Sequence, residues 1–194
     1  MPLKLKGSTS GSVELDVPAV VGGDVSLELP GGGTVDRLER AGNILQVVQG
    51  TTTTEVTVTT TTWTDTTLSA TITPTSATSK VLIIVNQHYY ATRSNFGSGV
   101  GVRILRGTTV IDTPIELSSN QPRSVLVTVD AANSVQVSGF YNRLILDSPS
   151  TTSSITYKIE GRPFRSDSSG SAIFQRASVS TQPVSNITLM EIAA

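Results

Sequence analysis

Hydrophobic and polar positions alternate in two short stretches near the beginning of the chain. The first is Ser12–Val17 and the second is Asp24–Leu29, and each is bounded by glycine or proline. A period of two is that of a half-buried β-strand, so the pattern predicts two strands. An isolated hairpin is marginal in water, so these strands need a partner surface. Two arrangements supply one: the hairpin folds back onto the rest of the chain, or three chains share one core.

Short apolar or alternating runs, separated by turn residues, continue to the end of the chain. No window of about fifteen residues sustains a period of 3.6, so we expect very little helix. Many short strands joined by Ser-, Thr-, Pro- and Gly-containing turns predict an all-β sandwich. The expected strands are Ile44–Gln49, one around Val56 and Val58 inside a threonine-rich run, Leu68–Ile72, Val81–Tyr90, Val100–Leu105, Val110–Ile111, Ser124–Val129, Val135–Phe140, Arg143–Leu146, Ser154–Glu160, Ser171–Ser178 and Ser185–Ile192.

The same pattern divides the chain into three parts. Residues 1–34 are predicted to form an N-terminal β segment for attachment or trimerisation. Residues 35–42 form a linker, because Val35–Arg40 has a helix-like charge density that Gly42 and Asn43 end at once. Residues 43–194 form the head domain, since this part alone is long enough to bury a sizeable core.

Composition narrows the classes of function. Lys and Arg number 14 and Asp and Glu 15, and the net charge of −1 creates no field that favours nucleic acid or an anionic membrane. The absence of cysteine excludes disulfides, thiolate metal sites and cysteine nucleophiles. Met1–Gly7 is followed by serine and threonine instead of an apolar run, so we expect no signal peptide and synthesis in a cytoplasm. No apolar run approaches the roughly 20 residues of a membrane helix, so no membrane insertion is expected.

Side chains that could carry catalysis are few. His88 is the single histidine, and no Gly-x-Ser-x-Gly elbow offers a nucleophile for a Ser-His-Asp triad. No Asp-x-Asp-x-Asp-Gly loop gathers oxygen ligands for calcium. Asp112, Glu116 and Asp147 lie near predicted strand ends and could pair for glycoside hydrolysis, but a long substrate groove normally needs a longer chain. We therefore expect a protein that is not an enzyme and that binds no metal and no cofactor.

Several parts of the sequence resemble a recurring kind of bacteriophage structural protein found in cyanophages. The opening of the chain resembles that of many phage tail-fibre and tail-appendage proteins, in Leu3–Leu15, Pro18–Gly22 and Leu29-Pro30. The remainder resembles a phage head domain similar to the C1q and tumour-necrosis-factor jelly roll, in early strands at Ile44–Val48, Trp63–Pro74 and Ser79–Ile83 and in late strands at Leu146–Pro149, Ile155–Ile159 and Ile187–Ile192.

The resemblance implies a homotrimeric jelly-roll β-sandwich and a structural role in a virion, reached after synthesis in the host bacterial cytoplasm. The first hypothesis is a short trimeric tail fibre or appendage. Its N-terminus would dock to a tail hub, adaptor or nozzle protein, and its head would contact a host surface glycan or protein. The alternative is a capsid decoration, or cement, protein that binds the major capsid protein and stabilises the phage head.

Two groups of side chains are candidates for contacts. Arg93, Asn95 and Phe96 lie in a predicted loop from Thr92 to Gly99, where a guanidinium fork, an amide and a flat apolar ring suit a sugar of the host receptor. The further candidate loops are Asn120–Arg123 and Arg165–Gly170. The aromatic residues in alternating strands are candidates for the core or the trimer axis: Tyr89, Phe140 and Tyr157.

Overall fold

The computed structural model describes residues 3–6, 12–15, 41–94, 97–114, 124–127, 135–164, 170–177 and 181–194. The chain divides into two compact units, Met1–Leu38 and Glu39–Ala194. The boundaries predicted after residues 34 and 42 stay predictions.

In the first unit, β1 (Leu3–Lys6) and β2 (Ser12–Leu15) form an antiparallel pair with Leu3 opposite Leu15. The strand β2 confirms the first part of the strand predicted at Ser12–Val17. Its partner is β1, whose Leu-Lys-Leu-Lys sequence also has a period of two. The second predicted strand, Asp24–Leu29, lies outside the described residues.

The second unit is built from strands throughout its described part, and these confirm the all-β prediction. They are β3 (Ile44–Thr52), β4 (Val56–Val58), β5 (Thr64–Ile72), β6 (Lys80–Arg93), β7 (Ser98–Arg106), β8 (Thr109–Asp112), β9 (Val125–Val127), β10 (Val135–Asp147), β11 (Ile155–Pro163), β12 (Ser171–Phe174) and β13 (Ser185–Ile192).

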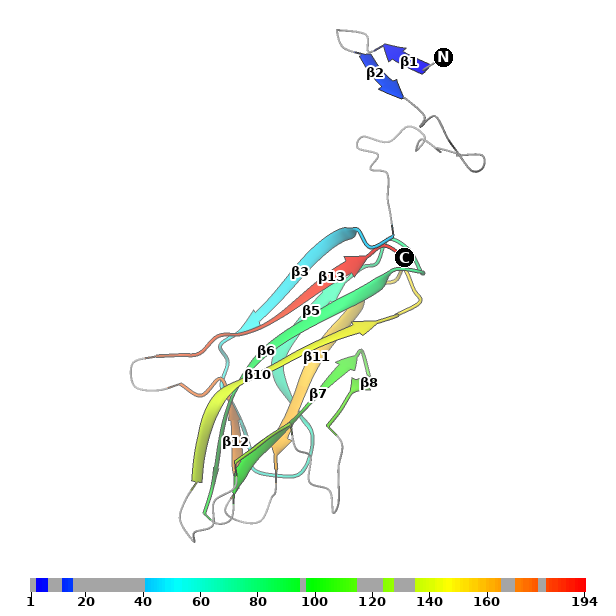
Figure 1. Ribbon diagram of the computed structural model, residues 1–194. Coiled ribbons are helices and arrows are strands. Elements are labelled where there is room, and N and C mark those ends of the chain that lie inside the picture. Colours follow the sequence, from blue (N-terminus) through cyan, green and yellow to red (C-terminus); the bar gives the residue numbers. More distant parts are fainter. Residues whose placement is uncertain are drawn as a thin grey trace. The chain divides into compact units, whose positions relative to one another are not determined.

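Eight of these strands pair in a nested order. β3 pairs with β13, β5 with β11, β6 with β10 and β7 with β8, all antiparallel. The pairs β13·β6 and β11·β7 join them into a first sheet, β3-β13-β6-β10, and a second sheet, β5-β11-β7-β8 (Figure 1). A chain that is folded in half, paired along its length and wound into two sheets has the jelly-roll topology. The predicted jelly-roll β-sandwich is therefore confirmed, whereas the homotrimer stays a prediction.

Three short strands extend these sheets at their edges. β12 pairs with the second half of β6 and carries β4 on its other side, and β9 pairs with the beginning of β7. The strand β4 confirms the prediction of an ordered strand inside the threonine-rich run. Because β13 pairs only with the first half of β6 and β12 with the second, the connection from β12 to β13 runs past the middle of β6.

The core lies between the two sheets and follows from the alternation of each strand. On β5 every second residue from Thr66 to Ile72 is buried, and on β13 every second residue from Ser185 is buried. Successive side chains of a strand point to opposite faces, so one face of each sheet supplies the core. The largest apolar side chains that are fully buried there are Leu68, Ile72, Ile83, Ile104, Tyr157, Ile159, Phe174, Ile187 and Leu189.

One predicted break is wrong. Two strands were expected at Val135–Phe140 and Arg143–Leu146, but β10 is continuous from Val135 to Asp147. The two residues between the predicted strands are Tyr141 and Asn142, and asparagine is common in turns. In the structure Asn142 lies opposite Asn86 at an outward position of the sheet, where a polar side chain preserves the alternation.

A polar cluster is buried at the middle of β6. Ser185 Oγ accepts hydrogen bonds from the His88 backbone N–H at 2.8 Å and from Gln87 Nε2 at 3.2 Å. Thr66 Oγ1 lies 2.9 Å from Gln87 Oε1. Gln87 and Ser185 are fully buried, so their hydrogen bonds compensate for the loss of water. The cluster ties β5 and the beginning of β13 to β6 at the place where the connection from β12 passes.

Candidate functional site

The outer face of the first sheet is apolar near one end. Across its four strands, Val47 lies opposite Met190, Met190 opposite Leu82, and Leu82 opposite Leu146. In the next row, Ile84 lies between Thr188 and Leu144. We call the apolar face the set Val47, Leu82, Ile84, Leu144, Leu146 and Met190.

Several side chains of the apolar face are far from buried. Leu144 is 61% exposed, Val47 56% and Leu146 55%. Scattered exposed apolar residues are ordinary on a protein surface, but a contiguous group of them marks an interaction site. The register of the four strands makes these residues neighbours, so they form one continuous surface.

The outer face of the second sheet has the opposite character. Glu160 forms ion pairs with Arg103 at 2.6 Å and Lys158 at 3.1 Å, and Lys158 also reaches Asp65 at 3.5 Å. Trp63 lies between two guanidinium groups, with Arg103 4.7 Å and Arg162 4.8 Å from the ring centroid. Antiparallel sandwiches usually present a polar outer face to water. The outer face of the second sheet is therefore charged, whereas that of the first exposes apolar side chains.

Beyond the apolar face, a row of amides crosses the first sheet. Asn86 lies opposite Asn142 on one side and Asn186 on the other. The Oδ1 atom of Asn86 is buried and has no hydrogen-bond partner within the described part of the chain. This row separates the apolar face from a pocket on the same side of the sheet.

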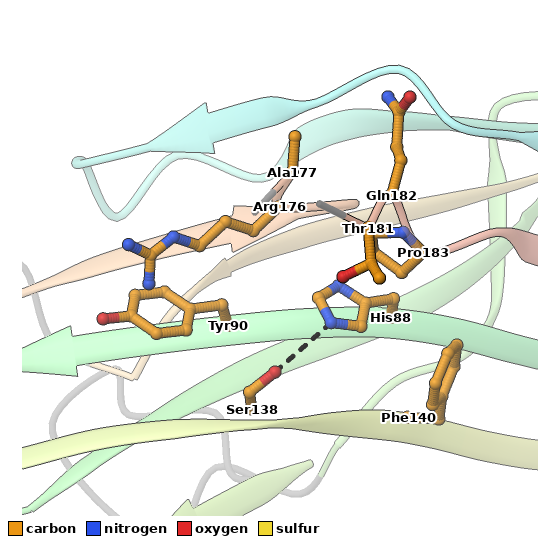
Figure 2. A pocket seen from close by; sticks show the side chains of 9 residues that line it. All are labelled: His88, Tyr90, Ser138, Phe140, Arg176, Ala177, Thr181, Gln182 and Pro183. Atoms are coloured by element: carbon orange, nitrogen blue, oxygen red, sulfur yellow. Dashed lines mark hydrogen bonds between the residues drawn. The ribbon is translucent and has the colours of Figure 1, made fainter. Parts of the chain in front are cut away.

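The pocket has a volume of about 740 Å³ and a floor made by two strands (Figure 2). On this floor His88 of β6 lies opposite Phe140 of β10, and Tyr90 lies opposite Ser138. The described residues between β12 and β13 form the wall: Arg176, Ala177, Thr181, Gln182 and Pro183.

His88 is 8% exposed and contacts two side chains of the floor. Its Nε2 atom lies 3.3 Å from Ser138 Oγ, and its ring meets the Phe140 ring in an edge contact with centroids 5.3 Å apart. Its Nδ1 atom has no hydrogen-bond partner within the described residues. Burial lowers the pKa of His88 below its usual 6.5, so the neutral imidazole dominates at neutral pH. Among the described residues no carboxylate orients Nδ1, as a Ser-His-Asp triad requires.

Two hydrogen bonds hold the pocket wall. The backbone N–H of Ala177 donates to Glu55 Oε2 at 2.8 Å, and Gln182 Nε2 donates to the Thr53 carbonyl at 2.6 Å. The guanidinium of Arg176 stacks on the Tyr90 ring, 3.7 Å from its centroid. The wall thus places one cation directly above the floor, as Figure 2 shows.

Of the three predicted receptor residues, the structure describes Arg93, which does not line the pocket. The predicted loop boundary at Thr92 is wrong, because β6 continues to Arg93. Arg93 is 6% exposed, and its Nη1 donates to the Gly97 carbonyl at 3.4 Å. Asn95 and Phe96 lie outside the described residues, as do residues 120–123 and 165–169 of the other two predicted loops. Their contact with a receptor stays a prediction.

The three aromatic candidates for the core or trimer axis are divided between the inside and the outside of the sandwich. Tyr89 and Tyr157 are buried inside the sandwich of a single chain. The Tyr157 hydroxyl donates to Asp147 Oδ2 at 2.8 Å, and burial together with this hydrogen bond raises its pKa. Phe140 is 46% exposed on the outer face of the first sheet. Of the three, Phe140 has surface available to a partner.

The pocket was missed by the sequence analysis, apart from Phe140 and His88 as single residues. Arg176 and Gln182 carry no local signal, because they reach the pocket through the path of the connection from β12 to β13. Among carboxylates considered for glycoside hydrolysis, Asp112 is paired with Arg143 at 2.7 Å and Asp147 with Arg106 at 2.9 Å. Glu116 lies outside the described residues.

Neither a metal cluster nor a membrane helix is found where the structure can be described. No three His, Cys, Asp or Glu side chains of those residues gather in a group that could hold a metal ion. The same residues include no helix of the length and hydropathy needed to cross a membrane.

Comparisons with known proteins identify no family. No family model matches the chain, and no curated protein matches it significantly. Similar solved structures include that of infectious bursal disease virus, Gt strain, with a TM-score of 0.34 and 16% identity over 98% of this chain and 46% of that chain. T=1 particles derived from infectious bursal virus give a TM-score of 0.35 and 14% identity over 98% of this chain and 44% of that chain. This chain spans less than half the length of either, and likeness at this level gives no information on its function.

Proposed function

We propose that this chain is a structural protein of a bacteriophage virion, a short tail fibre or appendage that assembles as a homotrimer through the apolar face. The main support for the trimer is the difference between the outer faces of the two sheets. The outer face of one is charged, and that of the other exposes Val47, Leu144 and Leu146 by more than half. The phage tail rests on the resemblance of the N-terminal sequence and of the head strands to phage appendages.

The energetics favour covering the apolar face. Full burial of a large aliphatic side chain stabilises by about 1.5–3 kcal/mol relative to exposure. Three such side chains, each about half exposed, contribute about 2–5 kcal/mol per copy when they are buried, so the apolar face supplies part of the free energy of association and the rest of the interface supplies the remainder. In a ring of three copies each copy uses the same two patches, so the apolar face would meet a second patch of the neighbouring copy around the three-fold axis.

Within this proposal the first unit serves attachment. The pair β1–β2 has two strands only, so each strand has a backbone edge without a partner in the pair. Such an edge can add to the sheet of another protein. Docking to a tail protein by residues 1–34 would leave the jelly-roll domain free to face outward, toward a host glycan or protein.

Native mass spectrometry of the purified chain tests the assembly. We expect a trimer for the wild type and a monomer for Leu144→Asp, because a charge within the apolar face cannot be buried without a partner. Ser69→Asp is the matched control: it places the same charge on the exposed outer face of the second sheet, opposite Lys158, and should remain trimeric. A monomeric wild type, or a Leu144→Asp variant that stays trimeric, contradicts the proposed interface.

The copy number of the chain in purified virions tests whether it belongs to the tail or to the capsid. A few dozen copies per particle, lost when residues 1–34 are deleted, is the result expected for a tail appendage. An abundance close to that of the major capsid protein would instead support the alternative, a decoration protein on the capsid. A chain that is not found in the particle contradicts both.

A further inference from the structure

The pocket beside the apolar face has the features of a ligand site that the assembly role does not use. Its volume of about 740 Å³ lies within the range of roughly 300–1,000 Å³ typical of small-molecule sites. Two short hydrogen bonds, to Glu55 and to the Thr53 carbonyl, hold the described residues on either side of its wall.

We propose that this pocket binds a small organic carboxylate with one flat apolar face, through Arg176 and Phe140. Two sources share this chemistry: a hexuronic acid unit of a glycan, and an aromatic carboxylate. The inference rests on the pocket alone and does not depend on the proposed place in a virion.

Charge selects the carboxylate. Arg176 is the only side chain with a full charge in the described lining of the pocket, because none of the lining residues is acidic and His88 is neutral. Its guanidinium carbon lies 3.7 Å from the centroid of the Tyr90 ring, a cation–π contact that holds the group above the floor. A guanidinium edge binds a carboxylate through two parallel hydrogen bonds. Stacking on Tyr90 holds that edge in position before the ligand arrives.

The residues of the pocket floor favour a ligand with a ring that packs on Phe140. Phe140 is 46% exposed, and its edge contact with His88 fixes the orientation of its ring. An aromatic ring of this kind packs against the C–H face of a pyranose or against another ring. Ser138 Oγ, beside it on the same strand, can exchange hydrogen bonds with a ligand hydroxyl.

The single histidine makes the test direct. In tag-free, isotope-labelled full-length chain, the imidazole signals belong to His88 alone, and its ring contacts Phe140 in the pocket floor. We would titrate the chain with glucuronate, glucose and benzoate and follow these signals by NMR. Glucuronate should shift the His88 signals, and the shift should saturate. Glucose has the same ring without the carboxylate and should bind at least about tenfold more weakly, since a charge-assisted hydrogen-bond pair accounts for about that factor. Tighter binding of glucuronate than of benzoate assigns the site to a sugar acid, and the reverse order assigns it to an aromatic carboxylate.

Three variants decide whether Arg176 carries the binding. Arg176→Gln should weaken carboxylate binding by about tenfold or more, and Arg176→Lys should fall between it and the wild type, because an ammonium keeps the charge but loses the fork. Lys80→Gln removes an equal charge from the far end of the same sheet and should bind like the wild type. Arg176 is exposed, so its variants should melt like the wild type. Equal binding of glucose and glucuronate, wild-type binding by Arg176→Gln, or no saturable displacement by either carboxylate overturns the inference.

Discussion

Adding one methyl group at Gly161 probes how the two sheets pack. Gly161 lies on β11 in the second sheet, and Phe174 lies on β12 at the edge of the first. A Cβ atom at Gly161 would lie 2.8 Å from Phe174 Cε1 and closer still to Cε2 and Cζ of the same ring. Phe174 is fully buried, so the ring has no solvent into which it can turn. We therefore predict that Gly161→Ala destabilises the jelly-roll domain.

The size of the effect follows from overpacking. Extra methylene groups in a well-packed core typically cost about 1–3 kcal/mol. For a domain of this size each kcal/mol lowers the melting temperature by about 2–4 °C. The expected loss is thus between about 2 and 12 °C.

Thermal unfolding followed by the fluorescence of Trp63 measures the melting temperature, and urea unfolding with the same probe gives the free energy, because Trp63 is the single tryptophan and lies within the described domain. Wild type and variant must be compared at equal protein concentration, since an oligomer gains stability by mass action.

A second substitution separates the proposed clash from other causes. Phe174→Leu removes ring atoms that the new methyl group would meet, so the double variant should be more stable than the sum of the two single effects by about 1 kcal/mol. A Gly161→Ala midpoint equal to that of the wild type, or strictly additive effects, would refute the contact between β11 and β12.

Other predictions follow from buried polar groups and from the apolar face. Burial acts to raise the pKa of Glu191, but hydrogen bonds from Gln46 Nε2 and from the backbone N–H and hydroxyl of Thr75 outweigh it, and the pKa is lowered. The contribution of Glu191 to stability is therefore present above its usual pKa of 4.5 and lost as the pH falls below it. The urea concentration at the unfolding midpoint should fall as the pH is lowered from about 7 to about 3, and it should fall less steeply in Glu191→Gln. Some dependence on pH should remain in the variant, because the pKa of Glu160 is also lowered. The same pH dependence in variant and wild type would contradict this prediction. Tyr157→Phe should cost about 1.5 kcal/mol in the same assay, because Asp147 keeps Arg106 but loses the hydroxyl donor; a neutral effect would mean that the hydrogen bond is replaced by water. Leu144→Asp should convert the trimer to a monomer, and analytical ultracentrifugation provides an independent check.

Strand positions were largely predictable from the sequence, because alternation is a local property. The runs at Val81–Tyr90 and Ser185–Ile192 became β6 and β13 almost as expected. The nested pairing of β3 with β13 and β5 with β11 was not predictable from alternation, since strand partners lie far apart in sequence and alternation does not identify them. The resemblance to a jelly roll supplied that part of the prediction.

The sites were predictable only in part, for a physical reason. Arg93 was placed in a loop because small and polar residues follow it, yet β6 continues through this position and buries it. Phe140 was selected as an aromatic residue in an alternating strand, and the structure places it on an outer face. Arg176 reaches Tyr90 because β12 pairs with β6 at Tyr89–Thr92 and Arg176 follows closely after β12, which depends on the tertiary fold.

A cryo-EM map of the phage particle that carries this chain tests the central claim most directly. The account predicts density with three-fold symmetry at the tail, in which the β3-β13-β6-β10 sheets of three jelly-roll domains contact one another through Val47, Leu144 and Leu146. The charged face of β5, β11 and β7 should point to solvent. A single copy at each position, or three copies that meet through the charged face and leave the apolar face exposed, would contradict it.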